Sequence, residues 1–326
     1  MTASADLSAA AHSPPRRRAP DFFIVGHPKS GTTALYEMLR SHPQIHMPVK
    51  EPWFFARELR LSTGDGLPET FEDYLSLFAA ASPDQRIGES TLGYLRSPTA
   101  ARRIADAQPA ARIIAILREP ASFVRSLHLQ FLQSNIETEK DLRKALLLED
   151  ARREGRDLPR TPHLPETFLY ADRVRYVEQL RRYHAVFPPE QVLVLIYEDF
   201  RRDNASTLRE VLRFLDVDEA SALETVEANP TVGVRSPRLN DLTQAVSVGA
   251  GPISGLVKGS LKALTPRPLR RGALRAVRHR VLYGTPRPPD EDLMAELRVR
   301  FSDEVVALSE YLGRDLVSMW GYEDVG

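Results

Sequence analysis

The sequence predicts an α/β fold, in which a central and mostly parallel sheet carries helices on both faces. Three short apolar runs have the length and continuous hydrophobicity of buried parallel strands: residues 22–25, 113–117 and 192–197. Apolar residues recur at helical spacing after these runs, for example in residues 34–39 and 203–215. Strands that alternate with helices in this way form parallel sheets that are covered on both sides.

Weaker patterns complete the predicted fold. Two further short strands are expected at residues 45–47 and 86–89. Three more helices are expected: one that starts at Pro120, one over Val174–Phe187 and one over Glu291–Leu312. Asp203 has the residue type and position of a helix N-cap.

The remaining segments suggest how the chain is organised. Residues 149–165 are charged and rich in proline, so we expect a surface excursion there. We expect a disordered tail over residues 1–20, followed by a single domain over residues 21–326. An irregular basic segment lies within that domain, at residues 249–289. A solvated basic face is the simpler interpretation of this segment, and the alternative is a surface for an anionic acceptor or for the headgroups of membrane lipids.

Composition excludes several classes of protein. Lys and Arg together equal Asp and Glu at 44 each, which argues against binding to nucleic acid over a broad surface. The chain has no cysteine, which excludes disulfides and thiolate metal sites. No apolar run is long enough to cross a membrane, and the N-terminus lacks the order of a secretory signal, so we expect a cytoplasmic protein. No feature of the sequence indicates an oligomeric state.

A glycine-containing turn follows the first predicted strand. Gly26 and Gly31 are separated by four residues, as in a phosphate-binding loop (P-loop) that leads into a helix. ATP-binding loops place a lysine directly after the second glycine, whereas this chain has Lys29 inside the loop. The strand at residues 113–117 ends in Arg118, where a metal-binding ATPase would favour a carboxylate. The pattern predicts a P-loop-type three-layer fold with two anion-binding positions. A small-molecule kinase and a non-catalytic nucleotide-binding module are the alternatives.

Two motifs in this order resemble a known family. Pro28-Lys29-Ser30-Gly31-Thr32-Thr33 resembles the 5'-phosphosulfate loop of sulfotransferases that use 3'-phosphoadenosine-5'-phosphosulfate (PAPS). Leu117-Arg118-Glu119-Pro120, with Ser126 further along the helix, resembles the 3'-phosphate site of that family, and Tyr197-Glu198-Asp199-Phe200 resembles a segment near its adenine. The resemblance extends from Phe22 to about Phe214. It implies transfer of a sulfuryl group from PAPS to a hydroxyl or an amine, with release of adenosine 3',5'-bisphosphate and without a metal. The acceptor would be a small molecule, a glycan or a lipid.

The resemblance also implies roles for individual residues. Lys29 would stabilise the charge on the departing phosphate, assisted by donors from Ser30, Gly31, Thr32 and Thr33. The 3'-phosphate would be held by Arg118 and Ser126, with Tyr197 near the adenine. Arg235 resembles the basic residue of a late loop that closes over the same phosphate, and a salt bridge at the rim of the site is its alternative role.

Lys50-Glu51-Pro52-Trp53-Phe54-Phe55 resembles a motif of the heparan-sulfate-type branch, in which the glutamate is the catalytic base. Glu51 is therefore the predicted base, and the three aromatic residues would line the acceptor pocket. The alternative is that these aromatics are core and that Glu51 pairs with an arginine. His46 and His128 are minor candidates for the base. The chain departs from the pattern of that branch at Ser90, a position where the branch often has a lysine that assists at the site.

Overall fold

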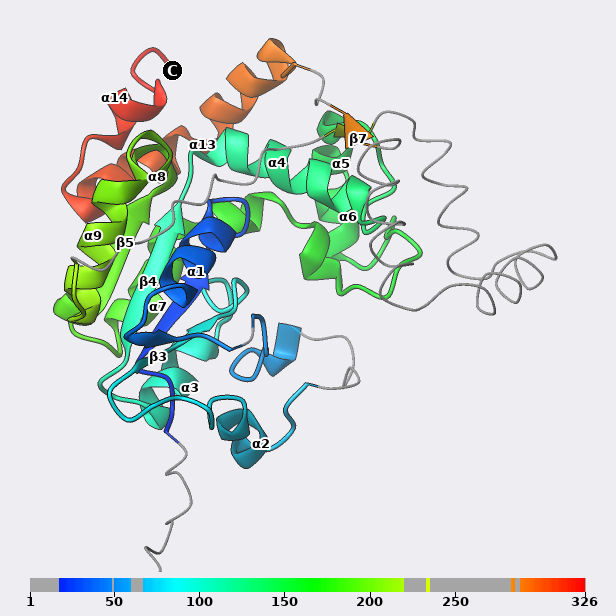
Figure 1. Cartoon of the computed structure of the whole chain (residues 1–326). Coiled ribbons are helices and arrows are strands. Elements are labelled where there is room, and N and C mark those ends of the chain that lie inside the picture. Colours follow the sequence, from blue (N-terminus) through cyan, green and yellow to red (C-terminus); the bar gives the residue numbers. More distant parts are fainter. Residues whose placement is uncertain are drawn as a thin grey trace, which may run out of the picture.

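The computed structural model describes residues 18–48, 50–59, 67–219, 233–234, 283–284 and 288–325 (Figure 1). Its centre is a five-stranded parallel sheet with the strand order β2-β3-β1-β4-β5. The strands are β1 (Phe22–Gly26), β2 (Ile45–His46), β3 (Arg86–Ser90), β4 (Arg112–Leu117) and β5 (Val192–Ile196). The predicted parallel sheet is confirmed. A short antiparallel pair, β6 (Gly233–Val234) and β7 (Tyr283–Gly284), lies apart from it.

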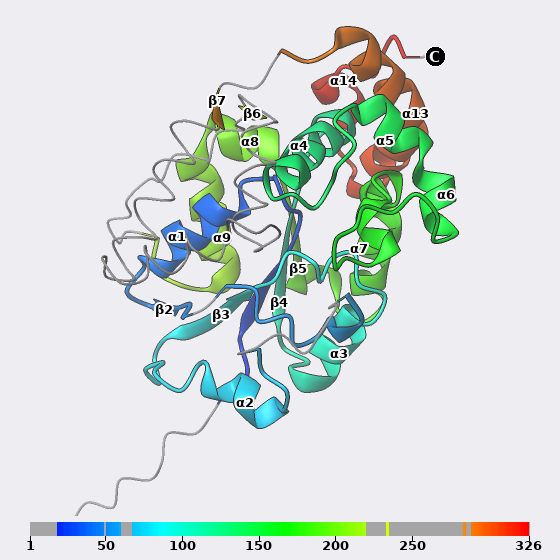
Figure 2. The same cartoon turned by 90° about the vertical axis from the view of Figure 1, so that its right-hand side faces the viewer.

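Helices cover both faces of the sheet, which Figure 2 shows nearly edge on. The described helices are α1 (Thr32–Arg40), α2 (Phe71–Ser76), α3 (Ala100–Ala107), α4 (Pro120–Gln133), α5 (Leu142–Leu147), α6 (Glu149–Arg153), α7 (Tyr176–His184), α8 (Tyr197–Arg202), α9 (Asn204–Leu215), α13 (Glu291–Leu312) and α14 (Leu316–Trp320). Helices α1 and α9 lie on one side, and α3, α7 and α13 lie on the other (Figure 2). None of the described helices has the length and apolar character needed to cross a membrane.

Alternating side chains of the strands enter two separate cores. Phe22 and Ile24 of β1 pack with Leu35 of α1 and Leu212 of α9. Their neighbour Phe23 points to the opposite core, which includes residues of α3, α4, α7 and α13. All five residues of β1 are buried, because both faces of a parallel sheet are covered. This double burial explains why the strand appears in the sequence as an unbroken apolar run.

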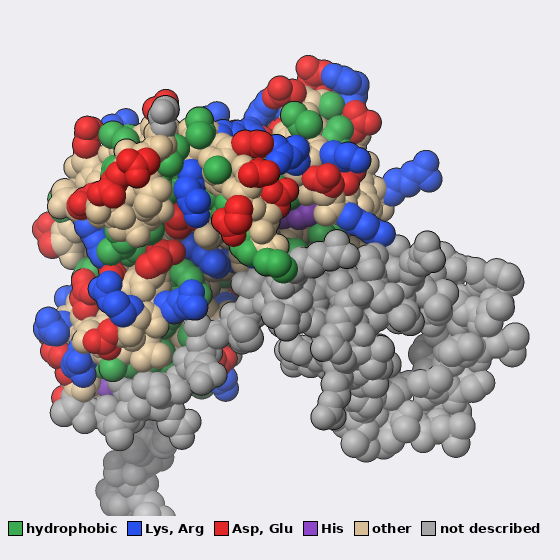
Figure 3. Space-filling model, turned by 90° about the horizontal axis from the view of Figure 1, so that it is seen from above, with side chains coloured by type: hydrophobic (Ala, Val, Ile, Leu, Met, Phe, Trp, Pro, Cys, Tyr) green, Lys and Arg blue, Asp and Glu red, His purple; other side chains and the backbone are tan. Residues whose placement is uncertain are grey.

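The predicted helix boundaries are largely confirmed. The side chain of Asp203 accepts a hydrogen bond from the amide of Ser206 and caps α9, as expected. Pro120 occupies the first turn of α4, and α13 spans the predicted residues. The prediction of a strand through Tyr197 was one residue too long, because Tyr197 begins α8. Charged side chains of both signs are interspersed over the face that Figure 3 shows, in keeping with the zero net charge.

Residues 149–165 are not simply a surface excursion. Their first five residues form α6, in which Arg152 is 1% exposed. The guanidinium of Arg152 donates two hydrogen bonds to the carboxylate of Glu137, at 2.7 and 3.0 Å, and the hydroxyl of Tyr170 donates to the same carboxylate at 3.0 Å. The prediction was wrong here because the partner that allows Arg152 to be buried lies on a different segment. The predicted tail and basic segment lie largely outside the described residues, and the single domain stays a prediction.

Removal of one partner of this buried ion pair leaves an uncompensated charge. We expect Arg152→Met to lower the free energy of unfolding by about 3–5 kcal/mol, measured by denaturant titration. The control is Arg153→Met, because Arg153 is a neighbouring arginine that is half exposed and pairs with Asp150 at the surface. Equal losses in the two variants would contradict a special role for the buried pair.

Candidate active site

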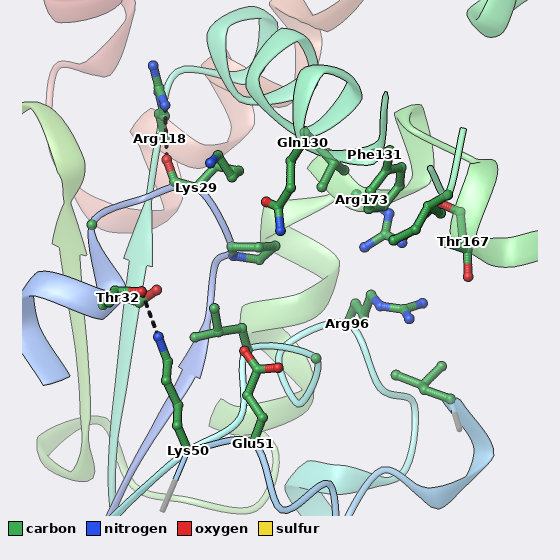
Figure 4. Close-up of a pocket in the computed structure, with 18 of the residues that line it drawn as sticks. Lys29, Thr32, Lys50, Glu51, Arg96, Arg118, Gln130, Phe131, Thr167 and Arg173 are labelled. Carbon is green, nitrogen blue, oxygen red and sulfur yellow. Dashed lines mark hydrogen bonds between the residues drawn. The ribbon is translucent and has the colours of Figure 1, made fainter. Parts of the chain in front are cut away.

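A cleft of about 530 Å³ opens at the carboxyl ends of the strands (Figure 4). Each strand of the central sheet is followed by a residue that lines it: Lys29 after β1, Glu51 after β2, Arg96 after β3, Arg118 after β4 and Tyr197 after β5. Parallel strands end at the same edge of a sheet, so residues that are distant in the sequence converge there. Open α/β sheets bind their ligands at this edge.

The loop between β1 and α1 depends on its second glycine. Gly31 has φ 81°, which is a left-handed conformation that favours glycine. A Cβ atom on Gly31 would lie 2.9 Å from the Phe200 ring, so close packing also excludes a side chain. Gly31, Thr32 and Thr33 line the cleft at the N-terminus of α1, where free amides favour an anion. Ser30 is fully buried, and its side chain does not line the cleft.

The two predicted cationic residues lie in the same cleft. Arg118 donates a hydrogen bond from Nη1 to the carbonyl oxygen of Lys29, at 2.9 Å (Figure 4). The pKa of Lys29 is lowered by burial and, secondarily, by the positive charge of Arg118. No carboxylate of the described chain forms an ion pair with either side chain. Two neighbouring cations that form no ion pair with a described carboxylate favour a ligand with negative charge.

Unused donors beside Arg118 fit such a ligand. The guanidinium of Arg118 lies over the Tyr197 ring, 4.7 Å from its centre, while its buried Nε has no hydrogen-bond partner in the described structure. The hydroxyl of Ser126 is also buried and has no partner among the described residues, although Ser126 does not line the cleft. Buried donors are normally satisfied, so these two are suited to a phosphate. Arg235 lies outside the described residues; the strand directly before it, β6, contacts α4.

Glu51 reaches the cleft from the segment after β2. Its amide donates to the carbonyl of Ser90 at 2.8 Å, which fixes the backbone of Glu51 beside β3. Its carboxylate points into the cleft, and none of the ion pairs given for the described chain includes it (Figure 4). The adjacent Lys50 donates to Thr33 at 2.7 Å, and burial lowers the pKa of Lys50. Lys50 was not among the predicted site residues, although it belongs to the same motif as Glu51.

The aromatic residues after Glu51 separate into two environments. Trp53 lines the cleft, and it packs on Gly93, where a Cβ atom would lie 2.1 Å from the indole ring. Phe54 instead stacks on Tyr74, with 4.6 Å between the centres of the two rings, and Phe55 is buried in the core. Of the three, only Trp53 lines the cleft, so the prediction that all three line one pocket is wrong for Phe54 and Phe55. The core interpretation is correct for Phe55.

The buried carboxyl of Glu89 supports the segment that carries Glu51 through hydrogen bonds. Glu89 accepts hydrogen bonds from the hydroxyls of Tyr74 at 2.6 Å, Thr91 at 2.6 Å and Tyr94 at 3.3 Å. The hydroxyl of Tyr94 also accepts the amide of Phe55, at 3.2 Å. Burial raises the pKa of Glu89 to about 7, although the three hydrogen bonds oppose this shift. Glu89 thus connects β3 to the segment that carries Glu51.

The predicted histidines do not line the cleft. His128 contacts the carbonyl of Glu139 at 2.8 Å, and His46 is half-buried. His27, next to the P-loop, contacts the carbonyl of Arg173 at 3.0 Å, and burial lowers the pKa of His27 to about 3. His163, which was not among the predicted residues, does line the cleft. Four further polar residues that were not predicted lie there: Arg96, Gln130, Thr167 and Arg173.

An α/β sheet with an anion-binding loop after its first strand defines a P-loop-type protein. Residues 19–231 match the family model of the sulfotransferase domain, and the chain belongs to that family. This membership favours transfer of a sulfuryl group over the kinase and the non-catalytic module that the sequence left as alternatives.

Individual relatives agree with the family match. The chain is 24% identical over 242 residues to bifunctional heparan sulfate N-deacetylase/N-sulfotransferase 1 of Caenorhabditis briggsae, which covers 72% of this chain and 27% of the relative. It is 29% identical over 274 residues to carbohydrate sulfotransferase 15 of Mus musculus, and this match covers 69% of this chain and 47% of the relative. The chain thus spans between about a quarter and a half of these relatives. A solved sulfotransferase from Alicyclobacillus acidocaldarius is 25% identical, with a TM-score of 0.67 and coverage of 93% and 98%.

The raised pKa of Glu89 predicts a dependence of stability on pH. The folded protein holds the proton of Glu89 more tightly than the unfolded chain does. The contribution of this proton to the free energy of unfolding is therefore complete below the ordinary pKa of 4.5 and is lost as the pH rises through 7. Between about pH 5.5 and pH 8.5, we expect the wild type to lose about 2 kcal/mol of unfolding free energy relative to Glu89→Gln. Denaturant titrations at several pH values measure this difference. Exposed Glu190→Gln is the control, and parallel pH profiles for wild type and Glu89→Gln would contradict the prediction.

Proposed function

We propose that this sulfotransferase uses PAPS as its donor and releases adenosine 3',5'-bisphosphate. The observation that carries the proposal is the contact of Arg118 with the Lys29 carbonyl, which joins two cationic groups in one cleft. PAPS has negative groups at both ends of one adenosine, so it matches two neighbouring cationic positions. The unpartnered donors of Arg118 and Ser126 support assignment of the 3'-phosphate to their side of the site.

The proposed reaction moves one sulfuryl group. A hydroxyl oxygen or an amine nitrogen of the acceptor attacks the sulfur, and the bond between sulfur and the oxygen of the 5'-phosphate breaks. Lys29 and the amides at the start of α1 stabilise the charge that develops on the departing phosphate. Glu51 accepts the proton from the acceptor, a role supported by its place in the cleft and by the lack of an ion pair that would occupy it.

A glycan is the acceptor class that we favour over a lipid or a small apolar molecule. Polar side chains, including Gln130 and Thr167, line the cleft together with apolar ones such as Phe131, and this mixed lining suits the hydroxyls and the ring faces of a sugar. Two similar proteins have names that refer to heparan sulfate and carbohydrate. Trp53 supplies an apolar surface in the same wall, against which the face of a sugar ring can pack.

The donor assignment predicts a specific binding defect. Arg118→Ala should weaken the binding of adenosine 3',5'-bisphosphate by about 1.5–3 kcal/mol, the range for hydrogen bonds to charged groups. Isothermal calorimetry measures the loss. Arg102→Ala is the control, because Arg102 is exposed on α3 and pairs with Asp106. Unchanged affinity in Arg118→Ala would remove Arg118 from the nucleotide site.

The assignment of the base predicts a loss of turnover without a loss of donor binding. Glu51→Gln should bind adenosine 3',5'-bisphosphate as the wild type does, while sulfuryl transfer to the acceptor falls roughly 10²–10⁴-fold. A labelled-sulfate assay over several acceptor classes measures turnover. Glu37→Gln, at a half-exposed position on α1, is the matched control. Full activity of Glu51→Gln would assign the role of the base to another group. His163, which lines the cleft, would be the next candidate.

A further inference from the structure

Two arginines come together on the side of the cleft away from the P-loop. Arg96 follows β3, and Arg173 precedes α7; Figure 4 shows both guanidinium groups at the same end of the cleft, across from Lys29 and Lys50. They are close enough that the positive charge of Arg96 contributes to lowering the pKa of Arg173, after the larger effect of burial. A close pair of like charges is unfavourable unless a negative group neutralises it.

The protein itself supplies little compensation for this pair. Arg173 is 7% exposed, donates to the carbonyl of Thr167 at 3.0 Å, and keeps a buried Nε without a partner in the described structure. No described carboxylate forms an ion pair with Arg96 or Arg173. Glu166 and, more weakly, Glu58 attract Arg96 without forming an ion pair with it, and the carboxylate of Glu58 is already bonded to Ser97 and Arg103. A buried arginine of this kind is suited to an oxyanion that arrives with a ligand.

The position of the pair separates it from the donor-binding groups. Arg96 and Arg173 also line a second cavity of about 500 Å³, which does not include Lys29, Arg118 or Glu51. The pair therefore stands where the two cavities meet, and Glu51 lies between it and the P-loop in Figure 4. A ligand held by these arginines would present its neighbouring groups to Glu51.

We propose that Arg96 and Arg173 form an oxyanion subsite for the acceptor, so that the preferred acceptor carries a carboxylate or a sulfate beside the group that is sulfated. This inference rests on the proposed function, because it places the acceptor in the half of the cleft that the donor leaves open. The planar guanidinium groups donate in pairs to carboxylate or sulfate oxygens, which gives orientation as well as affinity. The subsite thus selects charged acceptors and directs their reactive group.

Three small sugars that differ in one group test this subsite without the need for turnover. The probes are methyl glucoside, methyl glucuronide and methyl glucoside 6-sulfate, titrated by NMR into protein saturated with adenosine 3',5'-bisphosphate. We expect at least one charged sugar to bind about tenfold or more tightly than methyl glucoside, as hydrogen bonds between charged groups allow. Preference for the glucuronide identifies a carboxylate acceptor, and preference for the 6-sulfate identifies one that is already sulfated.

Variants connect the preference to the two arginines. Arg96→Gln and Arg173→Gln should each remove most of the preference for the charged sugar, while Arg102→Gln, at an exposed position on α3, should retain it. Should Arg173→Gln fail to fold because its side chain is buried, the half-buried Arg96 decides the question alone. Equal binding of the three sugars, or a preference that persists in Arg96→Gln, overturns the subsite.

The nucleotide titration keeps this result separate from the donor assignment. If adenosine 3',5'-bisphosphate binds but the sugars are not distinguished, only the subsite is wrong. If the bisphosphate does not bind, the donor proposal is wrong, and the sugar titrations are repeated on the free protein to decide the subsite by itself.

Discussion

The hydrogen bond from Arg118 to the carbonyl of Lys29 holds the centre of this site together. It joins the ends of β1 and β4, which are neighbours in the sheet, and it keeps a guanidinium next to the loop that carries the lysine amine. The loop can take this path because Gly31 adopts a left-handed conformation that packs against Phe200. Backbone geometry, rather than attraction between side chains, therefore places two like charges in one cleft.

Much of this arrangement could be predicted from the sequence, because it follows from strand order. Buried parallel strands leave unbroken apolar runs, and the residues that follow such runs meet at one edge of the sheet. Lys29 and Arg118 each follow one of the clearest runs, so their presence in one cleft was a consequence of a correct fold prediction. Glu51 was found only through a motif, since β2 before it has just two residues.

Other features depend on contacts that no local pattern reveals. Arg152 is buried because Glu137 and Tyr170 meet it from other segments, and Phe54 leaves the cleft because Tyr74 offers a stacking partner. Arg173 lies in a short 3₁₀ helix (Ala171–Val174), where neither periodicity nor a motif marks it as a cleft residue. Ser30 belongs to the P-loop motif, yet its side chain is fully buried. For Arg152 and Phe54, the deciding partner is distant in the chain.

The contact between Gly93 and Trp53 ties the shape of the cleft to a position that bears no side chain. The indole of Trp53 occupies space that any Cβ atom at residue 93 would need, so residues 53 and 93 can change during evolution only together. A relative with alanine or a larger residue at position 93 must have a smaller or displaced side chain at position 53. Such a paired substitution would change the width of the cleft and, with it, the range of molecules that the cleft admits.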